Sequence, residues 1–303
     1  MTTGLKIIAG TFISLVFIAL FPAQGNPYVL QGPHVIQLIT ERLGQAQSLS
    51  VSQRVIFYNP ANLPDAQQPV AGQTASSPMA PGTIQLSESL KYVFSEAFRS
   101  DIISESNQRI YVFNQGQSIT IIDGIVSDAG ESRFDVYKDL LLYRSKETLS
   151  ERLSKLGVDI SISSLGSFEG RPALVLGAEF PDDTVPQVWV DKETFQPLRV
   201  MVFDSKSTYS PRTGFLEIRY SKWQQIGKIN YPMQIEFIQD GVTVRAIEVE
   251  DYQINPKFSK DTFDIAGLKL AYRQPIRTPD PSAENEGLSE VQKTIEEFRK
   301  IFE

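Results

Sequence analysis

The stretch QVWVDKETFQPLR, residues 187–199, has the pattern of two short strands joined by a tight turn. The first strand carries Trp189 and ends where the acidic Asp191 starts the turn. Pro197 begins the return strand, and the first residue of a strand is a position at which proline is tolerated. The stretch therefore predicts an antiparallel hairpin.

Further strands are predicted on both sides of this hairpin, at short intervals along the chain. Turn signals separate them, such as Glu169-Gly170, Pro181-Asp182-Asp183 and Asp240-Gly241. The predicted strands cover residues 158–164, 172–180, 186–191, 197–204, 213–223, 231–239 and 241–252.

The first hundred residues combine a helix, strands and an insertion. A short amphipathic helix is predicted around residues 35–43, entered through Gly32-Pro33 and ended near Gly44. A strand follows at 50–58, and residues 59–85, rich in Pro, Ala, Gln, Ser and Gly, predict a flexible insertion. From Lys91 apolar residues recur at every second position, which predicts one strand. One side of this strand carries Tyr92, Phe94, Phe98 and Ile102.

The middle of the chain holds a hairpin and then two helices. Residues 109–113 and 118–122 predict the hairpin, with Asn114-Gln115-Gly116 as a three-residue turn. Apolar residues then recur at spacings of three and four, which is typical of short helices. They are Phe134, Tyr137, Leu140 and Leu141, followed by Leu149, Leu153 and Leu156.

Together these elements predict a mainly β (α+β) fold. Roughly ten strands, with helices only at the front and in the middle, favour an antiparallel sheet that curls into a barrel or half-barrel. The strands do not alternate with helices, which excludes a wound α/β fold. The folded domain is expected to span residues 26–274.

The N-terminus predicts export. Lys6 precedes an apolar run from Ile7 to Phe21, and small residues follow at Ala23 and Gly25, which is the order of a signal peptide over residues 1–25 with cleavage near Gly25. The run is too short to span a bilayer comfortably. The chain has no cysteine, so neither disulfides nor a lipid-modified N-terminus is expected. The expected location is the periplasm of a bacterial envelope.

The C-terminus predicts a linker and a last helix. Residues 275–287 contain Pro275, Pro279 and Pro281 among polar residues and are expected to be a linker. Residues 288–303 then have an apolar helical face that includes Leu288, Val291, Ile295 and Phe298. Two interpretations stay open: the helix folds back on its own domain, or it binds an envelope protein or a membrane surface.

Charge and motifs argue against several function classes. Lys and Arg number 29 against 36 Asp and Glu, a net charge of -7, and without a basic stripe nucleic acid is not an expected partner. His34 is the only histidine and lacks a nucleophile motif, so it is interpreted as a polar residue at a helix start. Neither a metal site nor a nucleotide or other cofactor is expected. A glycosidase that uses two separated carboxylates stays open, because any of the 36 acids could pair in space, but the sequence singles out no pair.

Three segments together resemble a known family. They are Arg-Ser-Asp-Ile at 99–102, Tyr-Lys-Asp-Leu-Leu at 137–141 and the hairpin at 187–199. Their order resembles that of the LolA-type outer-membrane lipoprotein-sorting proteins, with the LolA, LolB and LppX type of fold, over roughly residues 34–270. The resemblance implies a strongly curved antiparallel sheet, an incomplete barrel whose open side is plugged by helices. It also implies that acyl chains or other apolar ligands bind between sheet and helices.

The first hypothesis is therefore a non-enzymatic periplasmic carrier of lipids or lipoproteins. The chain has 18 Phe and 11 Tyr, which line either an ordinary core or a ligand cavity. The residues predicted to contact the ligand are Phe94, Phe98, Ile102, Tyr111 and Phe113 on the sheet and Tyr137 and Leu141 on the helices. The second hypothesis is a sensory or scaffolding module of the same fold that binds a protein through its C-terminal helix. A hydrolase is the third.

Overall fold

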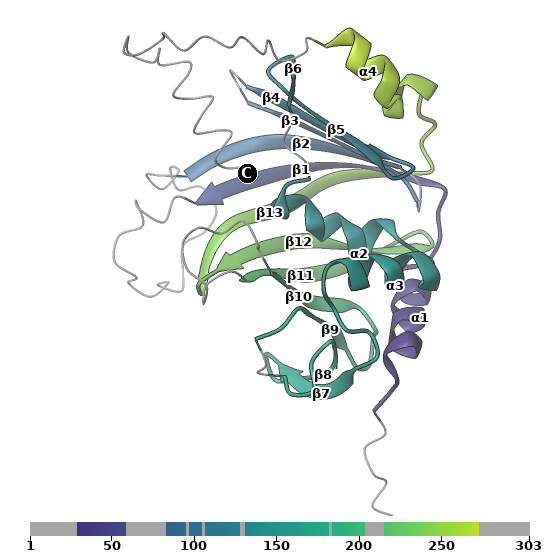
Figure 1. The fold of residues 1–303 in the computed structure, drawn as a ribbon, viewed down its shortest axis with the longest axis vertical. Coiled ribbons are helices and arrows are strands. Elements are labelled where there is room, and N and C mark those ends of the chain that lie inside the picture. The colour runs from purple at the N-terminus through teal and green to yellow at the C-terminus, as the bar shows by residue number, and fades with distance from the viewer. Residues whose placement is uncertain are drawn as a thin grey trace, which may run out of the picture.

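A computed structural model describes residues 29–58, 83–94, 97–104, 107–127, 131–181, 184–203 and 215–272. The predicted signal peptide, linker and C-terminal helix, and almost all of the predicted insertion, lie outside these residues. The described residues form one antiparallel sheet of 13 strands that curves around three helical segments and does not close into a barrel (Figure 1). The predicted fold class, a mainly β incomplete barrel, is confirmed.

The strand order shows how the sheet is assembled from two meanders. It runs β6-β5-β4-β3-β2-β1-β13-β12-β11-β10-β9-β8-β7, so every pair except β1–β13 joins strands that follow each other in the chain. β1 and β13 pair in the middle, with Leu49 opposite Ile254 and Phe57 opposite Arg245. The free edges of the sheet are therefore β6 and β7, which are consecutive in the chain.

The N-terminal meander begins with helix α1 and continues through six strands. Helix α1 ends at Gly44, which has a φ of 74° and whose place a larger residue cannot take, because a Cβ would lie 2.0 Å from the Lys228 carbonyl oxygen. The elements are α1 (Gly32–Leu43), β1 (Ser48–Tyr58), β2 (Thr83–Val93), β3 (Ala97–Ile103), β4 (Gln108–Asn114), β5 (Gln117–Ile122) and β6 (Ile125–Ser127).

A helical connection then crosses the concave face from the β6 edge to the β7 edge (Figure 1). It consists of η2 (Arg133–Lys138), α2 (Asp139–Leu142) and α3 (Lys146–Lys155). Ser132 and Asp135 form a capping box at the start of η2, and Ser145 caps α3. We call residues 131–155 the plug, because this connection closes the open side of the sheet.

The C-terminal meander returns to the middle of the sheet and ends in two short helices. Its elements are β7 (Ser163–Phe168), β8 (Arg171–Leu176), β9 (Gln187–Asp191), β10 (Pro197–Phe203), β11 (Phe215–Ile226), β12 (Ile229–Gln239), β13 (Val242–Ile254), η3 (Lys260–Phe263) and α4 (Ile265–Ala271). The hairpin at 187–199 is β9 and β10, as predicted, with Pro197 opposite Val190. Asp191 accepts hydrogen bonds from the backbone of Glu193 and Thr194 and so holds the turn.

Both faces of the sheet are used. The largest apolar cluster joins the concave face to α1 and the plug, and includes Ile36, Leu141, Leu153 and Ile235. On the convex side a second cluster packs Val112 and Ile121 against Phe263 and Ile265 of the last two helices. A third, around Trp189, covers the outside of β8 and β9. The helices η3 and α4 were not predicted from the sequence.

Several predicted boundaries were wrong. The single strand at 91–102 is the β2–β3 hairpin, in which Tyr92 lies opposite Phe98. The predicted insertion ends earlier, since its last three residues, Thr83 to Gln85, already belong to β2. Residues 158–162 form turns after α3 instead of a strand, because the amide of Ile162 donates to the Asp159 carbonyl. The turn after β4 has two residues, Gln115 and Gly116, both with positive φ.

Candidate functional site

The candidate site is the interface between the concave face and the plug. All of the seven predicted ligand-contacting residues lie in or against the large apolar cluster at this interface. Phe98, Ile102, Tyr111, Tyr137 and Leu141 are buried in it, and Phe94 and Phe113 are half-buried against it. The structure thus brings these seven side chains together, while their contact with a ligand stays a proposal.

The concave face has two chemically different halves. Over β8–β11, eight inward residues carry only hydrocarbon, and all are at most 4% exposed. We call them the aliphatic wall: Leu174, Leu176, Val188, Val190, Val200, Val202, Leu216 and Ile218. Over β1–β5, each strand instead contributes a buried polar residue to the interior: Gln53, Glu88, Ser100, Arg109 and Thr120. We call β1–β5 together with β13 the polar half.

Glu88 is the centre of the polar half. Its carboxylate accepts hydrogen bonds from Gln53 Nε2 at 2.6 Å, from Ser100 Oγ at 2.5 Å and from Arg245 Nη2 at 3.5 Å. Gln53 also donates to the Tyr137 hydroxyl of the plug at 3.3 Å. Because a buried carboxylate needs such donors, these groups form a fixed network and not a loose polar patch.

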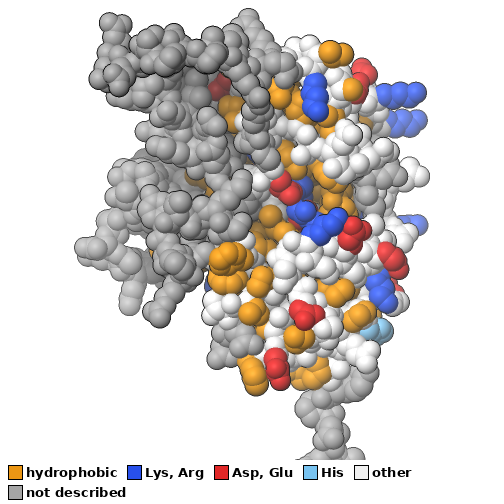
Figure 2. Space-filling view, viewed as in Figure 1, with side chains coloured by type: hydrophobic (Ala, Val, Ile, Leu, Met, Phe, Trp, Pro, Cys, Tyr) orange, Lys and Arg blue, Asp and Glu red, His pale blue; other side chains and the backbone are white. Residues whose placement is uncertain are grey.

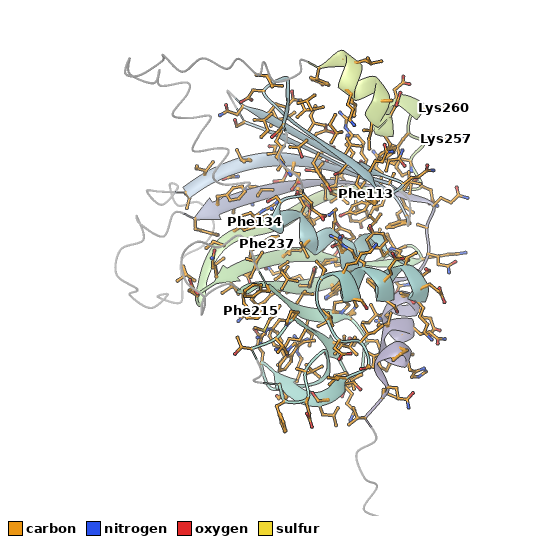
Figure 3. The ribbon with its side chains drawn as sticks, in the orientation of Figure 1. Phe113, Phe134, Phe215, Phe237, Lys257 and Lys260 are labelled. Atoms are coloured by element: carbon orange, nitrogen blue, oxygen red, sulfur yellow. The ribbon has the colours of Figure 1, made fainter. Side chains whose placement is uncertain are left out.

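Arg245 lies inside a cage of aromatic rings. Its guanidinium is 4.8 Å from the ring centroid of Phe237, 5.3 Å from Phe57 and 5.7 Å from both Phe134 and Tyr137. Figure 3 shows Phe134 and Phe237 close together at the start of the plug, with ring centroids 5.7 Å apart. Arg245 also donates to the Phe134 carbonyl oxygen at 3.1 Å, so it binds β13 to η2.

A buried ion pair makes a second connection between sheet and plug. Arg109 of β4 binds Asp135 of η2 through two hydrogen bonds, of 3.2 and 2.6 Å, and their side chains are 1% and 4% exposed. Removing one partner of such a pair leaves an uncompensated buried charge, which typically costs about 3–5 kcal/mol. The pair therefore resists separation of η2 from the sheet.

Within the plug, Lys138 and Arg152 hold its helices to each other. Lys138 contacts Glu131 and lies 3.5 Å from Asp139, over the rings of Phe98 and Tyr111. Arg152 of α3 binds both Asp139 and Glu131 at 2.7 Å. These contacts join α3 to the preceding turns.

The charges in this network shift one another's pKa values. Burial alone would lower the pKa of Lys138, but the charges of Asp139 and Glu131 outweigh it and raise that pKa. Burial raises the pKa of Asp139, against the effects of Lys138 and Arg152. For Asp135 burial acts to raise the pKa, but Arg109 outweighs it and the pKa is lowered. Asp135 is therefore held as a carboxylate.

This lowered pKa predicts a loss of stability in acid. Asp135 binds its proton less readily folded than unfolded, so its contribution is present near neutral pH and is lost as the pH falls below about 4. Urea unfolding between pH 7 and pH 3 should show a steeper decline in the free energy of unfolding for the wild type than for Asp135→Asn, by up to about 1.4 kcal/mol per pH unit. Parallel curves would contradict the prediction.

Arg144 joins the plug to α1. It donates to the carbonyl oxygens of Leu43 at 2.6 Å and Gly44 at 3.0 Å, and its guanidinium lies 4.0 Å from the Phe94 ring centroid. Burial lowers its pKa to about 10. Phe94, one of the predicted ligand contacts, is thus covered by a cation.

The buried charges Glu88 and Arg245 were not predicted from the sequence. Glu88 lies in β2 between the inward residues Leu86 and Leu90. Arg245 lies in β13 two positions before the inward residue Ile247. A charged residue at an inward position of an amphipathic strand is the signal that would have identified them.

Other candidate sites receive no support. Among the residues described, no group of three or more His, Cys, Asp or Glu side chains is arranged to hold a metal ion. His34 is exposed in the first turn of α1, at the helix start where it was predicted.

Across the described segments, the helices are too short or too polar to span a bilayer. On the face drawn in Figure 2, apolar, acidic and basic side chains are interspersed.

Comparisons with known proteins give likenesses of fold only. Neither a protein-family model nor a curated protein matches the sequence. Among solved structures, the chain is similar to a domain assigned to the outer-membrane lipoprotein-sorting proteins, from Vibrio parahaemolyticus, at 13% identity and a TM-score of 0.48, covering 78% of this chain and 98% of that one. A DUF1329 family protein from Desulfovibrio piger has 14% identity and a TM-score of 0.47, with 78% and 97% covered.

A LolA superfamily protein from Nitrosomonas europaea has 11% identity and a TM-score of 0.42, with 78% and 98% of the two chains covered. With TM-scores below 0.5, these likenesses say nothing about what this chain binds. The Vibrio parahaemolyticus and Nitrosomonas europaea proteins carry names of the lipoprotein-sorting or LolA type.

Proposed function

We propose that this protein is a periplasmic carrier that holds the acyl chains of lipids or lipoproteins between the concave face of its sheet and the plug. One observation carries the proposal: a single apolar cluster runs continuously from the concave strands to the undersides of α1, α2 and α3. The sheet is open, and the segment that covers it is a connection between the two free edges and not a further strand. Such a segment can separate from the sheet without breaking a strand pairing.

The energy of lipid transfer sets what the interface must provide. Burying an acyl chain is worth about 0.8 kcal/mol per methylene, so a sixteen-carbon chain costs on the order of 12 kcal/mol to expose to water. A carrier must offer a comparable apolar surface. The aliphatic wall and the leucines of the plug supply side chains of this kind on both sides of one interface.

The remaining features agree with a binding role outside the cytoplasm. The predicted signal peptide supports export, and lipids and lipoproteins need a carrier to cross an aqueous compartment. The charged side chains at the interface are engaged in fixed networks between sheet and plug, such as Arg109 with Asp135 and Arg245 with Glu88. We therefore propose a non-enzymatic protein.

Native mass spectrometry tests the proposal. The protein should be purified from the envelope fraction of its own organism, because a foreign host can lack the ligand. The expected result is an added mass that corresponds to an acyl-containing molecule and is released by organic solvent. After solvent extraction, the protein should bind a fluorescent fatty acid in titrations.

A protein that carries no added mass and binds no fluorescent fatty acid would overturn the carrier proposal. That result would favour the alternative, a module of the same fold whose interior is filled by its own side chains and which binds a protein partner. The helix suggested for that partner, residues 288–303, lies outside the described residues.

A further inference from the structure

We infer that the acyl chain binds against the aliphatic wall, beneath α3, and that the polar half, together with Tyr220 of β11, is the fixed anchor of the plug. The inference rests on the proposed carrier function and assigns the ligand to one half of the interface. The ligand class is a hydrocarbon chain, because the wall offers no hydrogen-bonding side chain.

A ligand at the aliphatic wall would displace only hydrocarbon. Leucines of the plug, among them Leu140, Leu149 and Leu153, belong to the same buried cluster as the wall and are at most 2% exposed. If these leucines move away, the methylenes of an acyl chain can take their place, so hydrocarbon replaces hydrocarbon. The interior of a protein tolerates such an exchange when the volume is kept.

On the polar half the same exchange is unfavourable. A chain inserted between η2 and the sheet would separate Arg109 from Asp135 and Arg245 from the Phe134 carbonyl oxygen. A hydrocarbon cannot satisfy any of these buried groups, which would be left without partners. The interface therefore resists an apolar ligand here.

The polar contacts between the plug and the sheet are concentrated at η2. Four strands hold η2 through polar contacts: Gln53 of β1 and Tyr220 of β11 bind Tyr137, Arg109 of β4 binds Asp135, and Arg245 of β13 binds the Phe134 carbonyl. In the described part of the chain, the side-chain hydrogen bonds and ion pairs of α3 run to the plug itself, with Arg152 bound to Asp139 and Glu131. Among the described residues, α3 therefore makes no side-chain hydrogen bond or ion pair to a strand, and apolar contacts hold it against the rest of the core.

The position of α3 also favours this half. Helix α3 is followed by the turns that lead into β7, the strand that pairs with β8 at the edge of the wall. Its buried residues Leu149 and Leu153 belong to the same cluster as the wall residues Leu174 and Val188. A shift of α3 about η2 would thus uncover the wall first.

Photo-crosslinking tests the assignment directly. The full-length protein should be loaded with a fatty acid that carries a diazirine in its chain, irradiated and digested, and the adducts mapped by mass spectrometry. Adducts are expected on the peptides of β8–β11 and α3. Adducts confined to β2–β4, residues 83–114, would overturn the inference while the carrier proposal stands. Absence of any adduct together with absence of fluorescent fatty acid binding would overturn the carrier proposal itself.

A matched pair of variants provides a second readout. Val200 in the wall and Val55 in the polar half are both buried β-strand valines on the concave face. We expect Val200→Phe to weaken binding of the fluorescent fatty acid about tenfold, because it fills the space of the chain, and Val55→Phe to leave the affinity within about twofold. The reverse order would contradict the inference, and the cross-linking result decides if either variant fails to fold.

Discussion

Replacing Arg109 with methionine is expected to lower the free energy of unfolding by about 3–5 kcal/mol. Methionine preserves much of the volume of the side chain but leaves the Asp135 carboxylate buried without its bidentate partner. The side chains of the pair are 1% and 4% exposed, so water does not replace the lost hydrogen bonds. Urea unfolding at pH 7, followed by circular dichroism, measures the loss.

A double-mutant cycle separates the ion pair from simple packing. In Arg109→Met with Asp135→Asn the buried charge is gone, and we expect the double variant to recover part of the lost stability relative to Arg109→Met. Arg171→Met is the matched control, because Arg171 is half exposed and lies 3.7 Å from Asp191. Its effect should be about 0–1 kcal/mol. Equal losses for Arg109→Met and Arg171→Met would show that the buried pair does not anchor the plug.

Replacing Phe237 with alanine is expected to be as destabilising, by about 3–5 kcal/mol. Phe237 is fully buried, and its ring lies 5.7 Å from the rings of Phe134 and Tyr137 and 4.8 Å from the Arg245 guanidinium. The substitution opens a cavity beside a buried cation and removes one wall of its aromatic cage. The loss should appear in the midpoint of urea unfolding.

Phe203→Ala is the control for Phe237→Ala. Phe203 is 52% exposed on the convex side and contacts Phe215 at a ring distance of 5.4 Å. Its truncation should cost about 1 kcal/mol. If both alanine variants unfolded at the same urea concentration, the aromatic cage would contribute no more than a surface contact.

The hairpin and the mixed helical and strand pattern were predictable because local spacing determines them. Asp191 accepts backbone hydrogen bonds in the β9–β10 turn and Pro197 begins the return strand, so these residue types predict the turn. Leucines spaced by three and four residues predict α3. The β2–β3 hairpin was not predictable in this way. Tyr92 and Phe98 differ by an even number of positions, so they share a face whether the chain runs straight or reverses between them.

The candidate site was predictable only as a group of apolar residues. Alternation identified Phe98 and Ile102 as inward, and the structure buries both. It could not show that Arg109 would meet Asp135, because that contact depends on how the plug crosses the sheet. Helix α4 was missed for a similar reason: it is seven residues long, and Ile265 is buried by the convex face of the sheet, which no local pattern reveals.

The pairing of β1 with β13 has a consequence for how the chain folds. These strands lie at opposite ends of the described chain, with Leu49 opposite Ile254, yet they form the middle of the sheet. Until β13 is available, β1 and β12 each leave an unpaired edge, and edges of this kind invite aggregation. Joining strands so distant in sequence also slows folding, because a long loop must close first. A chain truncated before β13 should therefore accumulate as two unjoined, aggregation-prone half-sheets.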